Sequence, residues 1–381
     1  VTKIPRFAFE KFRGSPAILT TSRKSVGEAM AIGRCFEESF QKAMRSLEIG
    51  RSGWGCDRPE PEISEREIDR LLRTPSPERI LWVRTAMLLG RSDDDLHRIS
   101  GIDPWFLAKL RRLIDAEQQL LTGRALASLD AEELLQLKQL GFSDRQIAWA
   151  TDSTELAVRD RRQTLGVNPV FKTVDTCAAE FASTTPYHYS TYERPLQKLN
   201  DAGELITTPP VKEGHSSGSG RRMMILGGGP NRIGQGIEFD YCCCHAAFSL
   251  SKIGFETVMV NSNPETVSTD YDTSDLLFFE PLTVEDVLHI IERIDPVGVI
   301  VQFTMGGVSG VTHSVAPSDT QQTDTYYIVA HFHYVMMGGM VLAFIGGLHQ
   351  LCFLIALEMQ VHVAEVGGGK IRAPCAGHDA V

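Results

Sequence analysis

The hydrophobic pattern changes period after residue 220, and this change constrains the fold more than any other feature. Helical spacing covers about residues 238–253 and 284–294. Short apolar segments, typical of strands, lie at residues 223–226, 257–261, 276–279 and 297–302. Alternating apolar strands and helices indicate a parallel sheet covered by helices. Residues 221–302 are therefore predicted to form an α/β domain with four strands.

The preceding residues, 23–172, carry repeated signals for short helices. Capping pairs and prolines mark helix starts, and glycines follow the last turns. The starts are Ser25 with Glu28, Pro77, Pro104, Asp130 with Glu133, and Ser143 with Gln146; the ends are Gly50, Gly90, Gly123 and Gly141. We expect an all-helical bundle in which the first helix covers residues 25–50. Residues 1–22 are interpreted as the end of another domain.

Two further zones differ from both domains. Residues 173–220 are polar, and Gly214–Gly220 has the composition of a flexible linker. No Asp, Glu, Lys or Arg lies between Asp324 and Glu358, and about 20 apolar residues suffice to span a bilayer. We therefore predict a linker over 173–220 and a hydrophobic segment over 303–357 that contains a membrane-like C-terminal helix. Residues 358–381 are an unassigned tail.

The charge and the cysteines limit the function classes. A net charge of −10 argues against nucleic acid or an anionic membrane as the main ligand. The eight cysteines, three of them consecutive, do not form a disulfide framework and fit a reducing cytosol. No apolar leader core follows Val1. A cytoplasmic location is expected, with the C-terminal segment membrane-like.

Four glycines, Gly227, Gly229, Gly234 and Gly236, lie between a predicted strand and a predicted helix. Such a loop can cradle phosphate with its backbone N–H groups, or it can serve only a tight turn. Nicotinamide dinucleotide binding is disfavoured because the spacing differs from G-x-G-x-x-G and because Asn261, not an acidic residue, ends the second strand. Phosphate binding and a structural role stay open.

Two other patterns are weaker. The run Cys242–His245 is unsuited to metal binding, because consecutive side chains on a helix point about 100° apart. Buried thiols are expected instead, and no catalytic residue or metal ligand is predicted. Ser143, Thr154 and the basic run 159–162 leave a helix-turn-helix binding module as an alternative, although the acidic chain disfavours it.

Long runs of residues then resemble a known family. Gly227–Tyr241 (GGGPNRIGQGIEFDY) and Val260–Asp275 (VNSNPETVSTDYDTSD) resemble the large subunit of carbamoyl-phosphate synthetase. Shorter runs at Val1–Phe7, Val174–Phe181 and Tyr189–Glu193 resemble other parts of that subunit. The resemblance covers about residues 1–302. It implies the end of the first ATP-grasp half (1–22), the oligomerisation domain (23–172) and the pre-ATP-grasp domain of the second half (221–302). This last part would be a truncated, Rossmann-like parallel-sheet domain.

The resemblance implies an activity for the intact enzyme. That enzyme is a ligase that makes carbamoyl phosphate from bicarbonate, ATP and ammonia for arginine and pyrimidine synthesis. It uses Mg²⁺ or Mn²⁺, and a glutaminase small subunit supplies the ammonia. Glu238 and Glu265 match glutamates that line the family's internal tunnel. The ATP-grasp catalytic residues have no counterpart in this chain, so it is expected to be inactive alone and to form homo-oligomers through the helical domain.

A second resemblance begins near Phe303. Asp324–Val335 (DTYYIVAHFHYV) resembles a transmembrane helix of haem–copper oxidase subunit I, with His331 and His333 at the family's haem-ligand positions. Thr323 departs from the family pattern near its magnesium site. The copper ligands are absent, and one helix cannot enclose a haem, so haem binding by this chain is not expected. The two resemblances meet in the middle of a domain, which predicts a joined reading frame, or chimera; an oxidase fragment stays an alternative.

Overall fold

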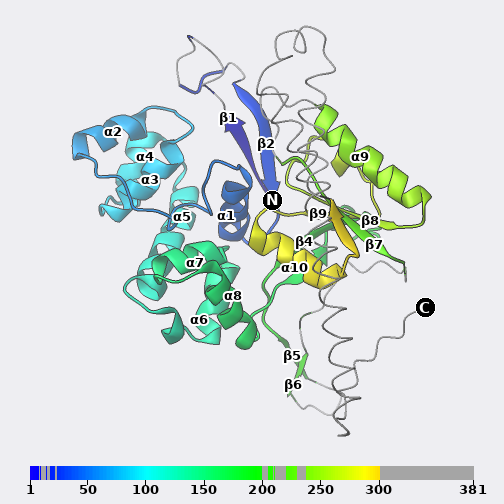
Figure 1. The fold of residues 1–381 in the computed structure, drawn as a ribbon. Helices are drawn as coiled ribbons and strands as arrows, with labels where there is room; N and C mark the ends of the chain where they lie inside the picture. Colours follow the sequence, from blue (N-terminus) through cyan, green and yellow to red (C-terminus); the bar gives the residue numbers. More distant parts are fainter. Residues whose placement is uncertain are drawn as a thin grey trace, which may run out of the picture. The chain divides into compact units, whose positions relative to one another are not determined.

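The computed structural model describes residues 1–300 except 8, 10–13, 15–17, 22–23, 200–204, 209, 211–219 and 230–236. The chain divides into two units, residues 1–301 and 302–381, and the second lies outside the described residues. The first unit opens with an antiparallel hairpin of β1 (Thr2–Phe7) and β2 (Ser25–Ala31). Figure 1 shows this hairpin beside α1, and both of its strands contact that helix.

Short helices make up residues 36–164, as the sequence predicts. They are α1 (Phe36–Ser46), α2 (Glu65–Arg73), α3 (Arg79–Leu88), α4 (Asp93–Ser100), α5 (Pro104–Ala116), η2 (Glu117–Leu121), η3 (Leu126–Ser128), α6 (Ala131–Gln139), α7 (Asp144–Ala150) and α8 (Glu155–Thr164). Reciprocal capping boxes start α6 at Asp130 and α7 at Ser143, and Asp103 caps α5 with Pro104 at its first position. Fully buried apolar side chains, among them Ile68 and Leu107, form the core of this part.

The prediction of one helix over residues 25–50 is wrong. Residues 25–31 form β2, and α1 begins only at Phe36 with Cys35 as its N-cap. Pairing with β1 satisfies the backbone groups of β2, so the Ser25–Glu28 pattern lies inside a strand and caps nothing. The helical spacing spanned a strand and a helix, because Val26 and Met30 are four positions apart and would share one face of a helix as well as one face of a strand.

The second part of the unit is a six-stranded sheet in the order β10-β7-β8-β9-β4-β3. Its strands are β3 (Val170–Thr173), β4 (Tyr187–Thr191), β7 (Arg222–Leu226), β8 (Glu256–Asn261), β9 (Leu276–Phe279) and β10 (Gly298–Ile300). Every neighbouring pair is parallel except β3 with β4. The remaining elements are β5 (Leu196–Leu199), β6 (Leu205–Thr208), α9 (Ile237–Lys252), η4 (Val267–Thr269) and α10 (Val284–Ile294). β9 and α10 have the predicted bounds.

Helices cover both faces of the sheet, and Figure 1 shows α9 and α10 on its two sides. Alternate residues of the strands serve the two faces. Ile225, Met259 and Leu277 pack with Cys243 and Ala247 of α9. On the other face, Met224, Val258, Val260 and Phe278 pack with Ile290 and Ile294 of α10. The predicted α/β layering is therefore confirmed for residues 222–300.

The interpretation of residues 173–220 as an irregular linker is wrong for β4. This strand pairs with β9 and β3 inside the sheet, which therefore has more strands than the four predicted. The composition concealed the strand because its buried polar groups find internal partners. The Ser190 N–H donates to Glu280, and the Ser190 carbonyl accepts from Lys42 Nζ at 2.7 Å.

Among the described helices, none is long and apolar enough to cross a membrane. The predicted membrane-like helix within 303–357 lies outside the described residues, and so do His331 and His333. The described structure therefore leaves the oxidase resemblance without a test.

Candidate functional site

The glycine loop follows β7 at the carboxyl edge of the parallel strands. The Gly227 N–H donates to the Val260 carbonyl at 2.8 Å, which holds the loop against β8. A Cβ at Gly227 would lie 2.5 Å from Asn261 Nδ2. Gly229 has a φ of 64°, and a Cβ there would collide with the Glu48 side chain. Gly227 is thus required by close packing and Gly229 by its positive φ. Gly234 and Gly236 lie outside the described residues.

A buried polar network fixes the loop between β8 and β9 beside the glycine loop. Asp240 of α9 is buried and accepts from both the N–H and the hydroxyl of Ser268. Asn261 Nδ2 donates to Ser268 Oγ at 3.1 Å, and Asn261 Oδ1 accepts from the Asn263 N–H at 3.0 Å. The polar residues of the long motif at 260–275 therefore hold the loop against the start of α9.

The two predicted tunnel glutamates belong to this same edge of the sheet. Glu265 lies in the β8–β9 loop, its side chain is 62% exposed, and its carboxylate is 3.2 Å from Lys3 Nζ. Lys3 also pairs with Glu28 of β2 at 2.6 Å, which links the hairpin to the loop. These carboxylates raise the pKa of Lys3. Glu238 lies in the first turn of α9, and its side chain is outside the described residues.

A second group of charged residues is buried where the helices meet the sheet. We call it the ionic junction: Lys42, Arg45, Lys138, Asp144, Arg162, Glu280, Glu285, Asp286 and His289. Lys42 Nζ lies 2.9 Å from Glu280. Arg45 makes a two-point contact with Asp286, at 2.9 and 3.0 Å. Both pairs join α1 to the segment that ends β9 and begins α10.

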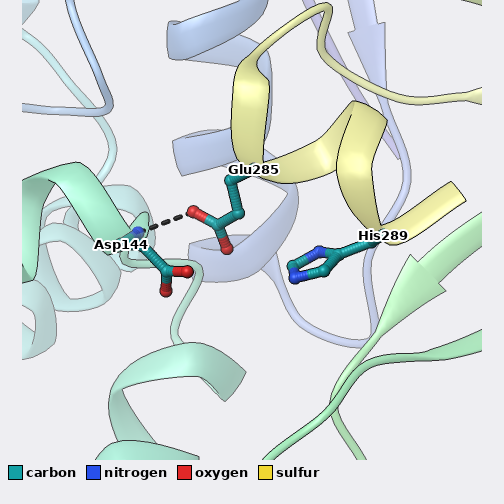
Figure 2. Close-up of side chains that lie close together, drawn as sticks. All are labelled: Asp144, Glu285 and His289. Carbon is teal, nitrogen blue, oxygen red and sulfur yellow. Dashed lines mark hydrogen bonds between the residues drawn. The ribbon is translucent and has the colours of Figure 1, made fainter. Parts of the chain in front are cut away.

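The other half of the ionic junction joins α6, α7 and α8 to α10. Figure 2 shows Asp144, Glu285 and His289 side by side, with the Asp144 N–H donating to Glu285 Oε2 at 2.6 Å. Lys138 Nζ bridges the carboxylates of Asp144, at 3.0 Å, and Glu285. Arg162 donates to Asp144 Oδ2 at 2.9 Å and lies 2.7 Å from His289 Nε2. Each anion of this group therefore has a cationic partner.

The surroundings of the ionic junction shift its proton equilibria. Burial opposes the charge of Asp144, but Lys138 and Arg162 outweigh it and lower the pKa of Asp144. Burial, with Asp144 nearby, raises the pKa of Glu285. Burial and then the Arg162 cation lower the pKa of His289 to about 3. His289 is therefore neutral at pH 7, and its Nε2 accepts from Arg162.

Asp144, Glu285 and His289 could in principle ligate a metal, because their ligand atoms lie within 4.8 Å of one another. Their donors are already engaged: Lys138 and Arg162 occupy both oxygens of Asp144, and Arg162 contacts Nε2 of His289. A bound cation would be adjacent to both of these positive groups, at a strong Coulomb cost. The cluster does not fit a metal site.

Two weaker sequence patterns find their place in the fold. Cys243 and Cys244 of α9 are buried, as expected, and burial raises the pKa of Cys244 to about 12; His245 is exposed. The helix-turn-helix alternative is not supported, because the arginines of α8 are engaged internally. Arg159 pairs with Glu292, and Arg162 is fully buried.

The ionic junction was not predicted from the sequence. Four charged residues of α1, Glu37, Glu38, Lys42 and Arg45, are buried. The apolar residues of the helix gather on the opposite face, so its pattern is that of an amphipathic helix with a solvated polar face. The sequence of the helix therefore carries no signal that its polar face is buried.

Two protein-family models match this chain. The first, described as "Carbamoyl-phosphate synthetase large chain, oligomerisation domain", matches residues 28–166. The second, described as "Carbamoyl phosphate synthase preATP-grasp domain", matches residues 219–329. The second match extends past Gln302, where the sequence analysis ended the resemblance. Neither match supports the oxidase-like interpretation of the following segment.

Curated relatives agree with the family models. The chain is 59% identical over 303 residues to a carbamoyl phosphate synthase large chain of Nostoc sp., covering 80% of this chain and 26% of the relative. It is 54% identical over 304 residues to a chloroplastic, arginine-specific large chain of Arabidopsis thaliana, covering 80% and 24%. The chain spans about a quarter of the length of the curated relatives it matches. The matched part of this chain therefore belongs to the carbamoyl-phosphate synthase large-chain family, and it corresponds to a fragment of a large chain.

Proposed function

We propose that this chain contributes the middle part of a ligase that makes carbamoyl phosphate from bicarbonate, ammonia and ATP. Its role there is to join two synthetase halves and to form part of the wall between them. The intact enzyme would use ATP with Mg²⁺ or Mn²⁺, a glutaminase subunit for ammonia, and self-association through residues 28–166. The chain alone is expected to be inactive. A cytoplasmic location stays a prediction, and one relative is named chloroplastic.

The observation that carries the proposal is the polar carboxyl edge of the sheet. Strands β7 and β8 are parallel, so the glycine loop and the β8–β9 loop emerge at the same edge. The bonds from Ser268 to Asp240 fasten the β8–β9 loop to α9, two residues beyond Glu238. A labile anionic intermediate passes along a polar, hydrated lining at lower cost than along an apolar one. Glu238 and Glu265 are therefore proposed to line its passage.

The test places residues 1–300 into the Nostoc large chain and measures three reactions with the glutaminase subunit present. These are bicarbonate-dependent ATP hydrolysis, formation of ATP and carbamate from carbamoyl phosphate and ADP, and complete synthesis. Glu265→Gln and Glu238→Gln should lower complete synthesis at least tenfold while both partial reactions persist. Asp272→Asn, an exposed carboxylate in the same loop, is the matched control. Equal complete synthesis in all three variants would contradict a role in passage.

The segment after Ile300 needs a separate test. The joined reading frame remains a prediction, and the family match to residue 329 weighs against placing the junction at Gln302. Amplification of genomic DNA across the codons for residues 300–340 decides it. An unbroken product of the expected length would contradict the joining hypothesis.

A further inference from the structure

A cavity of about 540 Å³ lies between the helices and the end of β4, away from the glycine loop. Its walls are the start of α1, parts of α5 and α6, the last residue of β4 and the three residues that follow it. Sites that enclose small molecules have volumes of about 300–1,000 Å³ and often lie outside the carboxyl ends of parallel strands. The proposed function assigns no role to this cavity.

Three arginines line the cavity: Arg34, Arg112 and Arg194. Their side chains are 57–60% exposed, so their remaining N–H groups are open to solvent. Guanidinium groups bind carboxylate and phosphate through paired hydrogen bonds. Residue types therefore favour an anionic ligand.

The carboxylates near these arginines do not neutralise them. Arg34 pairs with Glu193, whose other oxygen lies 3.1 Å from Lys172. Glu37 contacts Arg112 and also Lys109, 3.6 Å away. Each of these two carboxylates is thus shared by two cations.

The third arginine, Arg194, pairs with Glu132 among the described residues. The lining itself carries three arginines and two carboxylates, Glu38 and Glu193. Its formal charge is therefore positive, although the net charge of the whole chain is −10.

Buried polar groups form the inner lining. Tyr192 lines the cavity with only 8% of its surface exposed, and its hydroxyl has no hydrogen-bond partner among the described residues. Glu38, 1% exposed, lies beside it in the lining, and burial raises its pKa. Buried hydroxyls are almost always hydrogen-bonded. The Tyr192 ring packs against Lys138 and Arg162, so its free hydroxyl belongs to the side of the lining next to the ionic junction. The buried group joined to the rim is Glu38: its Oε2 accepts from the Arg34 N–H, and its Oε1 has no hydrogen-bond partner among the described residues.

We propose that this cavity binds a small organic anion, with its carboxylate or phosphate at Arg34, Arg112 and Arg194 and a hydroxyl or amine at Glu38. Glu38 also borders a smaller cavity that reaches Lys42 and His289 of the ionic junction. The proposal does not depend on carbamoyl-phosphate synthesis.

The test uses the full 381-residue chain and isothermal titration calorimetry with three probes. Ribose 5-phosphate carries phosphate and hydroxyls, 4-aminobutyrate carries carboxylate and an amine, and inorganic phosphate carries only the oxyanion. Either organic probe should bind at least fivefold more tightly than inorganic phosphate, because it also reaches the inner lining. The organic probe that binds identifies which oxyanion the rim prefers.

Two sets of variants locate the site. Arg34→Gln with Arg112→Gln should weaken binding at least tenfold, and it should fold because Glu193 and Glu37 keep their lysine partners. Glu38→Gln should weaken the organic probes about fivefold relative to inorganic phosphate. Arg70→Gln, exposed on α2, is the control and should change nothing. The proposal is overturned if no probe saturates, if only inorganic phosphate binds, or if the double variant binds as tightly as the wild type.

Discussion

Lys138 is the residue of the ionic junction at which one substitution leaves a buried carboxylate without its cation. Its ammonium bridges the carboxylates of Asp144 and Glu285, and its side chain is 2% exposed. Lys138→Met keeps the length and apolar stem of the side chain but removes the charge. Asp144 still has Arg162, at 2.9 and 3.2 Å, whereas Glu285 retains only the Asp144 N–H among these partners. The substitution therefore leaves Glu285 buried without its cation.

The size of the effect follows from that geometry. Removing one partner of a buried ion pair costs about 3–5 kcal/mol, because the other charge stays desolvated. Glu285 can escape this cost by binding a proton, and burial already raises its pKa. We therefore expect Lys138→Met to lose about 3–5 kcal/mol of unfolding free energy at pH 8 and less at pH 5. Adding Glu285→Gln to Lys138→Met should recover most of the loss at pH 8.

Urea unfolding at both pH values measures this prediction. Tryptophan fluorescence follows the helical part, because all four tryptophans lie between Trp54 and Trp149, and far-UV circular dichroism follows the whole chain. Arg70→Met removes an exposed ion pair and should change nothing measurable. A Lys138→Met variant within about 1 kcal/mol of wild type at pH 8 would refute the reasoning, since the bridge would then be dispensable.

Two further predictions test other parts of the fold. His289 has a pKa of 6.5 when unfolded and about 3 when buried beside Arg162, so the unfolded chain binds more protons in that window and stability falls as pH drops from 6.5 toward 3. His289→Gln should flatten this loss, measured as the change in urea midpoint between pH 7.5 and 5; an unchanged slope would contradict it. Gly227→Ala should cost about 1–3 kcal/mol, because its Cβ would meet buried Asn261 at 2.5 Å, whereas Gly228→Ala meets nothing within 4 Å. Equal unfolding midpoints for the two alanine variants would refute the packing role of Gly227.

The strands and helices after residue 221 were predictable because the capping residues and the hydrophobic pattern indicate the same elements. Thr283 caps α10, and the apolar residues of β9 form a continuous run that fits burial on both faces. β2 and β4 were missed for opposite reasons. A capping pattern inside β2 mimicked a helix start, and the polar residues of β4 mimicked a loop. Both segments are strands because they pair with another segment of the chain, and a local sequence pattern does not show this pairing.

The candidate sites were also predictable only in part. Long motifs located Gly227 and Glu265 at one edge of the sheet, because the carboxyl ends of parallel strands meet there. The ionic junction and the anion cavity escaped prediction because their residues come from segments far apart in sequence. Lys42 and Glu280, for example, are 238 positions apart. Only the fold shows that such charges share one buried space.

An ionic contact between helices and sheet has a consequence that an apolar contact lacks. Apolar surfaces can slide past one another with little loss, because burial depends on area rather than on pairing. Here each shift of α10 against α1 or α7 would separate Arg45 from Asp286, or Lys138 from Glu285, and leave both partners desolvated. Buried pairs of this kind add little net stability over apolar packing, but they penalise every alternative register. We infer that the junction favours one placement of the helices on the sheet over shifted ones.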